Sequence, residues 1–325
     1  MKRRDLIGIA GSAGALPALI SFLDAFQPSA PCSLFVVLHR SVETSHLAEI
    51  VDKATSFEVC EPGDGEPIRS SCIYLAPPDC HMMVGHGHLH LKRGPRENNF
   101  RPAIDPLFRS LAVFGMGRVC GVVLSGYLDD GASGARAIEA SGGIVLVQDP
   151  ADALSPAMPR AAISAVGEPR AIASASELGK LVGRISGEPA GKDIAADEKI
   201  KLEMMIAGLE KASMANENKL GELSPFNCPD CNGVLWEISD GPMTRFRCHT
   251  GHAYTAASLD KRQEEMLERS LYDSLRSLRE KTEMLRRLAE RGGSTTDRLL
   301  DRAEGYSQDA ETIEQMLLTR NSDAA

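Results

Sequence analysis

The stretch DLIGIAGSAGALPAL, residues 5–19, decides the fold. It joins a short, continuously apolar run, typical of a β-strand, to a helix-like run through a small-residue turn that contains Ser12. Such a strand–turn–helix unit suits either a nucleophilic serine lifted above the carboxyl edge of a sheet or a glycine turn that holds a phosphate. The basic start MKRR adds a third interpretation, an export signal.

The same alternation of strands and helices continues to about residue 185. The strand-like runs are LIGIA, SLFVVLH, CIYLA, CGVVLSG and GIVLVQD, and helix-like runs separate most of them. Continuously apolar strands are expected where helices cover both faces of a sheet, so the pattern predicts an α/β fold with a doubly wound, mostly parallel sheet. HMMVGHGHLHLK predicts an inserted β-hairpin that turns near Gly87. In IDPLF, Asp105 is the expected N-cap of a helix and Pro106 its first residue.

Composition excludes several classes of protein. The chain has 325 residues, of which 43% are hydrophobic and 25% charged, as in soluble globular proteins. The net charge of -9 argues against nucleic-acid binding, and there is no run of about 18 apolar residues to span a membrane. Asp5 interrupts the basic start, and removal of a signal peptide would delete the first strand. We therefore expect no export signal and a cytoplasmic protein.

The phosphate interpretation of the turn is disfavoured by two observations. Gly8, Gly11 and Gly14 are spaced three and three, which is not the G-x-G-x-x-G pattern of dinucleotide-binding folds. The second strand ends at His39, where such a fold needs an acidic residue for the ribose. We therefore expect no nucleotide cofactor.

The nucleophile interpretation needs a base and an orienting carboxylate. His39 ends the second strand, and Asp129 and Asp130 follow a later strand in GYLDDGASG. Each residue alone also fits a structural role: Ser12 as a helix cap, His39 as a solvated strand end, the aspartates as turn residues. Because the carboxyl ends of parallel strands meet at one edge of a sheet, their shared position favours a Ser-His-Asp arrangement.

Six segments of the sequence together resemble one known protein family. IAGSAGA, VVLHRS, DGEPIRSSCIYLAPPDCHMMV, FRPAIDPLFRSLA, GVVLSGYLDDGASGARAIEASGG and PAMPRAAI resemble, in this order, the catalytic domain of chemotaxis protein-glutamate methylesterases, the CheB family. The resemblance covers roughly residues 4–185. It implies a serine hydrolase that removes methyl groups from glutamate γ-methyl esters on chemoreceptor helices, with deamidation of receptor glutamines as a side activity.

The resemblance also assigns site residues. It implies Ser12 as the nucleophile, His39 as the base and Asp130 as the orienting carboxylate, because the family's aspartate directly precedes a glycine, here Gly131. The weaker candidates for the wall of the cleft are Arg101, Asp105 and Tyr127.

The chain departs from the family pattern at two places. The family usually has Ser-Thr-Gly-Gly where residues 12–15 are Ser-Ala-Gly-Ala, and Gly-Met-Gly where residues 126–128 are Gly-Tyr-Leu. These changes keep a second function open: an inactive signalling scaffold that binds receptors or a methyltransferase. Because the first strand starts at about Asp5, we also expect no receiver domain and no control by its phosphorylation.

A cysteine cluster follows in CPDCNGVLWEISDGPMTRFRCHTGH. Cys228 and Cys231 form a C-x-x-C pair, and Cys248 follows with His252 or His249 as the fourth ligand. Two such pairs can close a tetrahedral Zn²⁺ shell that leaves no open position, so its role would be structural. We prefer His252, because three intervening residues let the chain turn back. The histidines at 81, 86, 88 and 90 lack a completing ligand, and we expect them on a solvated hairpin.

We expect four segments along the chain: a methylesterase-type catalytic domain over 1–190, a linker and helix over 191–222, a zinc-ribbon-like module over 223–256, and a helical hairpin with a tail over 257–325. Apolar residues recur at helical spacing in the last segment, which predicts either an antiparallel hairpin whose two helices bury each other or a docking surface. We expect the sheet domain to keep its chemistry without the cysteine module, because it has a core of its own.

Overall fold

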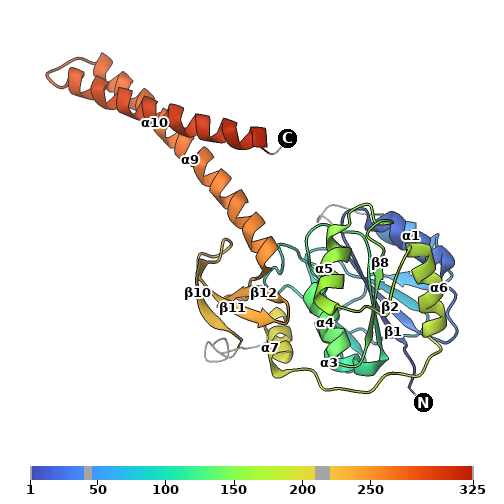
Figure 1. The fold of residues 1–325 in the computed structure, drawn as a ribbon. Helices are drawn as coiled ribbons and strands as arrows, with labels where there is room; N and C mark the ends of the chain where they lie inside the picture. The colour runs from blue at the N-terminus through green and yellow to red at the C-terminus, as the bar shows by residue number, and fades with distance from the viewer. Residues whose placement is uncertain (1, 40–45, 209–219, 324–325) are drawn as a thin grey trace. The chain divides into compact units, whose positions relative to one another are not determined.

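The computed structural model describes residues 2–39, 46–208 and 220–323. The chain divides into two compact units, Met1–Leu259 and Asp260–Ala325. The first unit contains a seven-stranded sheet, a β-hairpin and a smaller four-stranded sheet, and the second contains a pair of long helices (Figure 1).

The seven-stranded sheet confirms the predicted doubly wound architecture. Its order is β3-β4-β2-β1-β7-β8-β9, and all neighbouring strands are parallel. The strands are β1 (Leu6–Gly11), β2 (Ser33–Leu38), β3 (Glu58–Cys60), β4 (Cys72–Leu75), β7 (Val119–Val123), β8 (Ile144–Gln148) and β9 (Ala171–Ala173). The central ones are buried along their whole length, which explains their uninterrupted apolar sequence.

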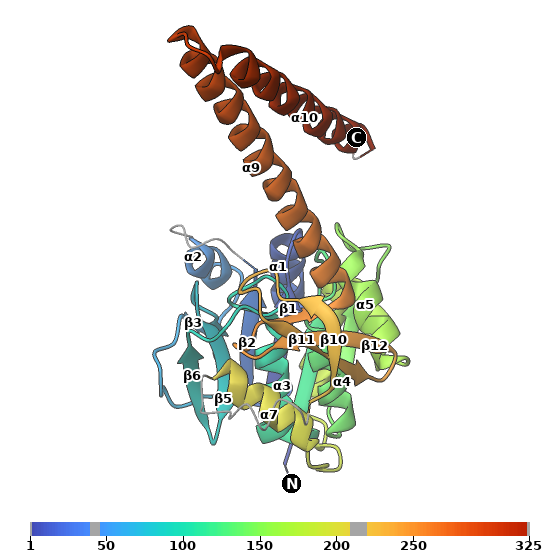
Figure 2. The ribbon, with the colours of Figure 1, turned by 90° about the vertical axis from the view of Figure 1, so that its left-hand side faces the viewer.

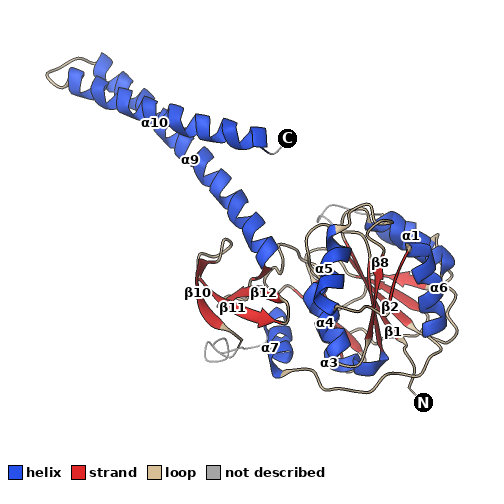
Figure 3. Ribbon diagram, viewed as in Figure 1, coloured by secondary structure: helices blue, strands red, loops and turns tan. Residues whose placement is uncertain are grey.

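Helices cover both faces of this sheet (Figures 1 and 3). One face packs against α1 (Ala15–Ala25), α2 (Leu47–Asp52) and α6 (Ala175–Ile185), and the other against α3 (Ile104–Gly115), α4 (Ala132–Ala140) and α5 (Ala157–Val166). The chain builds outward from β1 to β2 and later returns to place β7 on the other side of β1. The carboxyl end of β1 therefore lies at the topological switch point, where open α/β sheets place their sites.

The inserted hairpin is also confirmed. β5 (His81–Gly85) pairs antiparallel with β6 (His88–Lys92), and Gly87 takes a φ of 82° in the turn between them. Met82, Val84 and Leu89 belong to the core on the α3 side of the sheet. The hairpin thus covers apolar surface.

The predicted start of α3 is wrong by two residues. The helix begins at Ile104 with Ala103 as its N-cap, so Asp105 and Pro106 are the second and third helical residues. Pro106 still lies in the first turn, where a missing N–H breaks no intrahelical bond. The Asp105 carboxylate does not cap its own helix because it accepts the N–H of Gly134 in α4, at 2.7 Å.

The small sheet is antiparallel and has the order β10-β11-β12-β13. Its strands are β10 (Glu222–Asn227), β11 (Val234–Asp240), β12 (Met243–Cys248) and β13 (Ala253–Thr255). Helix α7 (Glu198–Ala207) precedes it. Residues 209–219 of the predicted linker and helix lie outside the described residues.

A buried cluster of charged side chains joins the small sheet to the large one. Glu203 of α7 accepts two hydrogen bonds from Arg245 of β12, both at 2.7 Å, and one from Arg109 of α3, also at 2.7 Å. Arg247 of β12 donates to Glu97 at 2.9 Å, and Glu97 also pairs with Arg109. These residues belong to three of the segments expected from the sequence, yet they pack together inside one compact unit, Met1–Leu259. The ribbon shows α7 beside α3 (Figure 2).

The second unit is a helical hairpin, as predicted. The chain runs through α9 (Ala256–Glu290) and returns in α10 (Thr296–Asp323). Leu275 of α9 is buried with Ala310 and Leu317 of α10, and Arg279 binds Glu314 at 2.7 Å. Within the described ranges, no helix is long and apolar enough to cross a membrane.

The buried charge cluster predicts a large cost for losing one of its two acidic members. Glu203→Ala leaves the buried guanidinium groups of Arg109 and Arg247 with Glu97 alone and that of Arg245 with only Asp240. We expect the free energy of unfolding to fall by about 3–5 kcal/mol in urea titrations. The matched control is Glu198→Ala on the same helix, because the Glu198 side chain is 87% exposed and its ion pair with Lys201 is open to solvent. Equal effects of the two substitutions would contradict the role of the cluster.

Candidate active site

The turn after β1 holds Ser12 in a fixed conformation. Gly14 takes a φ of 73°, and a Cβ there would lie 2.6 Å from Leu154 Cβ, so only glycine fits. Ser125, just beyond the end of the neighbouring strand β7, stabilises the turn. Its carbonyl accepts the Ser12 N–H at 3.0 Å, and its hydroxyl donates to the Ala13 carbonyl at 2.7 Å. Ser12 is therefore presented at the sheet edge by a rigid turn.

His39 lies beside Ser12 because β2 is the parallel neighbour of β1. The His39 N–H donates to the Gly11 carbonyl at 3.1 Å. The imidazole Nδ1 lies 3.1 Å from Ser12 Oγ, and Nε2 lies 2.7 Å from Asp130 Oδ2. With its proton on Nε2, the ring donates to Asp130 and leaves Nδ1 free to accept the serine proton. The two ring nitrogens are thus exchanged relative to the common Ser-His-Asp arrangement.

The Phe100 ring stacks on the imidazole of His39, with centroids 3.6 Å apart and planes 13° from parallel. Only 3% of the His39 side chain is exposed. The stacked ring shields the imidazole from water and restricts its rotation.

Asp130 is a fully buried carboxylate held by several donors. Its Oδ2 also accepts the N–H of Ile104 at 2.7 Å, and its Oδ1 accepts Asn98 Nδ2 at 2.8 Å and the Asp105 N–H at 3.3 Å. Ile104 and Asp105 open α3, so the charge sits at a helix N-terminus. Burial alone would raise the pKa of Asp130, but its bonds from His39, Ile104 and Asn98 outweigh burial and lower it.

Asp129 is placed differently from Asp130. Its Oδ1 accepts the hydroxyl of Thr255 at 2.6 Å. Strand spacing alone left either aspartate open as the partner of the histidine. The structure brings Asp130 to His39, as the position before Gly131 suggested.

The three weaker candidates for the cleft wall lie in different environments. Asp105 is buried and does not line a cleft, because its carboxylate accepts from Gly134 and from Asn98 instead. Arg101 is paired with Asp79, at 2.6 Å. Tyr127 is 62% exposed on the loop after β7, where it is open to a partner.

Sequence reasoning missed Asn98 and Phe100, which touch Asp130 and His39 directly. Both lie in an irregular loop, where hydrophobic periodicity carries no information. The one available signal was the Asn98–Asn99 pair, since asparagine tolerates the left-handed conformation that both residues adopt, with φ of 51° and 73°.

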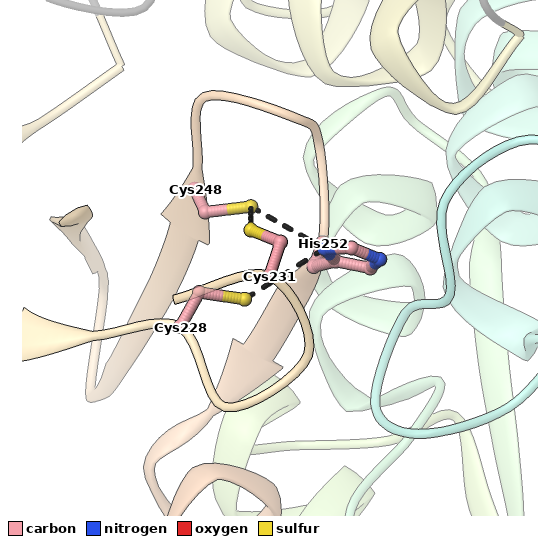
Figure 4. A group of neighbouring side chains, drawn as sticks. All are labelled: Cys228, Cys231, Cys248 and His252. Atoms are coloured by element: carbon pink, nitrogen blue, oxygen red, sulfur yellow. Dashed lines mark hydrogen bonds between the residues drawn. The ribbon is translucent and has the colours of Figure 1, made fainter. Parts of the chain in front are cut away.

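The predicted metal ligands come together at one end of the small sheet (Figure 4). The ligand atoms of Cys228, Cys231, Cys248 and His252 all lie within 4.8 Å of one another. Cys231 Sγ is 3.6 Å from Cys248 Sγ, and His252 Nδ1 is 3.7 and 3.5 Å from the sulfurs of Cys228 and Cys248. A tetrahedral zinc–thiolate shell has S–S edges of about 3.8 Å, so the set fits a metal ion of this kind.

The other histidine considered as a ligand is not part of this group. His249 packs on Gly233, where an added Cβ would lie 2.2 Å from its ring. Around the cluster, the Tyr254 hydroxyl lies 3.3 Å from Cys228 Sγ and 2.6 Å from Asp230. Across the described ranges, no second group of three or more Cys, His, Asp or Glu residues is close enough to hold a metal ion.

Comparison with known families agrees with this geometry. Residues 7–182 match the family model described as CheB methylesterase. The chain belongs to the CheB methylesterase family. The match contains all of the large sheet except the first residue of β1, and it ends before the cysteine cluster and the helical hairpin.

Relatives of this CheB-family chain carry consistent names. It is 35% identical over 184 residues to protein-glutamate methylesterase/protein-glutamine glutaminase 2 of Caulobacter vibrioides, covering 55% of this chain and 53% of that protein. It is 38% identical over 167 residues to the enzyme numbered 1 of Rhodospirillum rubrum, covering 49% and 43%. The CheB-family chain therefore spans about half the length of the curated relatives it matches.

The fold agrees as well. The CheB methylesterase catalytic domain of Thermotoga maritima superposes with a TM-score of 0.52 at 26% identity, covering 55% of this chain and 96% of that one. The resemblance stated from the sequence is confirmed.

The carboxylate pair beneath His39 predicts a pH-dependent stability. Burial and the charge of Asp130 raise the pKa of Asp105 to about 7, so folding takes up a proton between about pH 4 and pH 7. This group's contribution to the free energy of unfolding therefore falls as pH rises through that window. Asp105→Asn cannot titrate, and we expect its stability relative to wild type to improve steadily from pH 4 to 7.5 in urea titrations.

The pH dependence of the stability difference between Asp105→Asn and wild type distinguishes this effect from loss of a hydrogen bond. A lost hydrogen bond lowers the free energy of unfolding by the same amount at every pH. Asp52→Asn, at an exposed position ending α2, is the control and should track wild type. A difference between Asp105→Asn and wild type that is constant with pH would contradict the raised pKa.

Proposed function

We propose that this chain is a protein-glutamate methylesterase that hydrolyses glutamate γ-methyl esters on the cytoplasmic helices of chemoreceptors. The observation that carries the proposal is the hydrogen-bonded chain from Ser12 through His39 to Asp130 at the switch point of a CheB-type sheet. The names of the relatives support this substrate and add deamidation of receptor glutamines as a side activity.

In this proposal Ser12 is the nucleophile, His39 the general base and Asp130 the orienting carboxylate. Ser12 Oγ attacks the ester carbonyl as its proton passes to His39 Nδ1, and Asp130 stabilises the imidazolium. His39 then protonates the departing methoxide, which leaves as methanol and gives an acyl-enzyme. A water molecule deprotonated by His39 attacks that ester, and the carboxylate of glutamate leaves Ser12. With a glutamine substrate the same steps release ammonia.

The developing oxyanion needs hydrogen-bond donors near Ser12. Helix α1 begins three residues after Ser12, and the first N–H groups of a helix have no intrahelical acceptor. The Ala15 N–H donates to the Ser12 carbonyl at 3.0 Å and Pro17 has no N–H, which leaves Gly14 and Leu16 as the candidate donors. We assign the oxyanion to this helix start. Tyr127 and Leu154, which are 62% and 79% exposed, offer apolar surface near the turn for the substrate helix.

We further propose that Cys228, Cys231, Cys248 and His252 hold one structural Zn²⁺. Four protein ligands leave no position for water or substrate, so ester hydrolysis does not pass through the metal. The eight cysteines, all among the described residues, form no disulfide, which fits a reducing cytoplasm. The partners implied are methylated receptor helices and, as the source of the methyl esters, a receptor methyltransferase.

The triad assignment predicts a graded loss of methanol release from methylated receptor fragments. Ser12→Ala and His39→Ala should each lower kcat by roughly 10³-fold or more, and the double variant should be scarcely worse, because the residues act as a unit. Asp130→Asn should retain more activity than either. The matched control is Ser56→Ala, at an exposed position before β3, which should keep wild-type turnover.

Two outcomes would count against the assignment. Wild-type methanol release by Ser12→Ala would mean that another group attacks the ester. Receptor binding without any methanol release by the wild-type chain would favour the scaffold instead.

The metal assignment predicts about one zinc ion per chain by elemental analysis of protein prepared without chelator. Cys228→Ser should lose the metal and lower the thermal stability, because metal binding supplies folding free energy to so small a sheet. Cys80→Ser changes a partly exposed thiol outside the cluster and should keep the metal. Zinc-free wild-type protein, or full zinc content in Cys228→Ser, would overturn the assignment.

A further inference from the structure

The loop before α3 runs alongside the last strand of the small sheet. The Asn98 N–H donates to the Ala253 carbonyl at 2.8 Å, and the Ala253 N–H donates to the Arg96 carbonyl at 3.3 Å. Glu97 and Ala253 form a parallel bridge. The loop is thus paired with β13 through its backbone.

The same loop reaches two members of the triad. Asn98 Nδ2 donates to Asp130 at 2.8 Å, and Phe100 stacks on His39. Asn98 is buried, with 3% of its surface exposed. The loop therefore lies between the C-terminal small sheet on one side and the triad on the other.

The side-chain amide of Asn98 has its hydrogen-bonding capacity filled. Its two N–H groups point to carboxylates, Asp130 and, at 3.0 Å, Asp105. Its Oδ1 accepts the Thr255 N–H at 3.0 Å and lies 3.3 Å from the Ser258 hydroxyl. The opposite orientation would put the amide oxygen against two carboxylates and the NH₂ against a backbone N–H. The donor from the C-terminal segment therefore fixes which way the amide points.

The backbone of the loop also depends on these contacts. Asn98 and Asn99 both have positive φ, a conformation that asparagine tolerates better than most residues and that the contacts of the loop hold in place. Asn99 Nδ2 donates to the Ser258 carbonyl at 3.2 Å, which adds a second tie to the same segment.

We infer that Asn98 is a positioning residue for Asp130 and that the segment Ala253–Ser258 holds Asn98 in its donating orientation. The small C-terminal sheet therefore contributes to the geometry of the catalytic site. The inference deepens the proposed function and rests on it for its consequence in turnover. It opposes the expectation that the large sheet would keep its chemistry without the cysteine module. A third contact supports it: the Thr255 hydroxyl donates to Asp129, the neighbour of Asp130, at 2.6 Å.

The test uses two variants of the full chain and one matched control. Ser258→Ala removes a donor to Asn98 and touches no reacting atom, and Asn98→Ala removes the donor to Asp130. Ser270→Ala, further along α9, is the control, because its hydroxyl donates to the Met266 carbonyl of its own helix. A small activated ester is the substrate, so that receptor binding does not enter the comparison.

We expect kcat to fall roughly tenfold in Ser258→Ala and roughly a hundredfold in Asn98→Ala, with KM within about twofold of wild type, because a misplaced base slows the chemical step. Loss of the Asn98 donor leaves the Asp130 charge less stabilised, so His39 should hold its proton more tightly. The acidic limb of the kcat/KM profile should then move to higher pH in both variants. Ser270→Ala should match wild type in every measurement.

The midpoint of the His39 imidazole titration by NMR gives a readout that does not need turnover. A midpoint at higher pH in Asn98→Ala and Ser258→Ala supports the inference even if the wild-type chain releases no methanol. The absence of methanol release would contradict only the proposed activity. Midpoints equal to wild type in both variants would overturn it. If Asn98→Ala fails to fold, the result for Ser258→Ala alone tests the inference. If activity is lost only in proportion to the amount of unfolded protein, Asn98 is a purely structural residue and the inference is refuted.

Discussion

The buried negative charge of Asp130 is the constraint on which the rest of the site depends. A carboxylate removed from water is costly unless hydrogen-bond donors and positive charge replace its hydration. Here the donors come from three parts of the chain: the imidazole of His39, the first N–H groups of α3, and the amide of Asn98. The contacts that satisfy this charge are also those that orient the imidazole, so folding and the assembly of the site are the same event.

The same charge links the family fold to the residues beyond it. Helix α3 opens under Asp130, and one turn later it carries Arg109, which binds Glu97 and Glu203. Glu97 adjoins Asn98, and both acidic residues are held by arginines of β12. Most of these charges are satisfied only when the small sheet is docked. The match to the family model ends at residue 182, so Glu203 and the arginines of β12 lie outside the family domain, whereas Glu97 and Arg109 lie inside it.

Sequence patterns predicted the parts of the structure that depend on residues close together in the chain. Uninterrupted apolar runs identified the strands, and strand ends placed Ser12 and His39 on one edge, because parallel strands align their carboxyl ends. The choice between Asp129 and Asp130 needed the family resemblance, since both follow the same strand. Asp105 was misplaced because cap propensity is a local rule, and a tertiary contact with Gly134 overrode it.

What the sequence did not predict depends on long-range partners. Asn98 and Phe100 lie in a loop without periodicity, and their importance comes from what they touch. The buried charges gave no signal either: Glu203 and Arg245 are polar residues that a pattern assigns to solvent, and only the docked fold shows them facing each other at 2.7 Å.

The most direct test of the account is the site at which a fluorophosphonate reacts, located by peptide mass spectrometry on the full-length protein. Such a reagent forms a stable adduct only with a serine whose hydroxyl is activated by a neighbouring base. We expect a single adduct on Ser12, whose rate of formation rises as His39 loses its proton and falls steeply in His39→Ala. An unlabelled Ser12 in folded protein, or labelling of Ser12 at the same rate without His39, would contradict it.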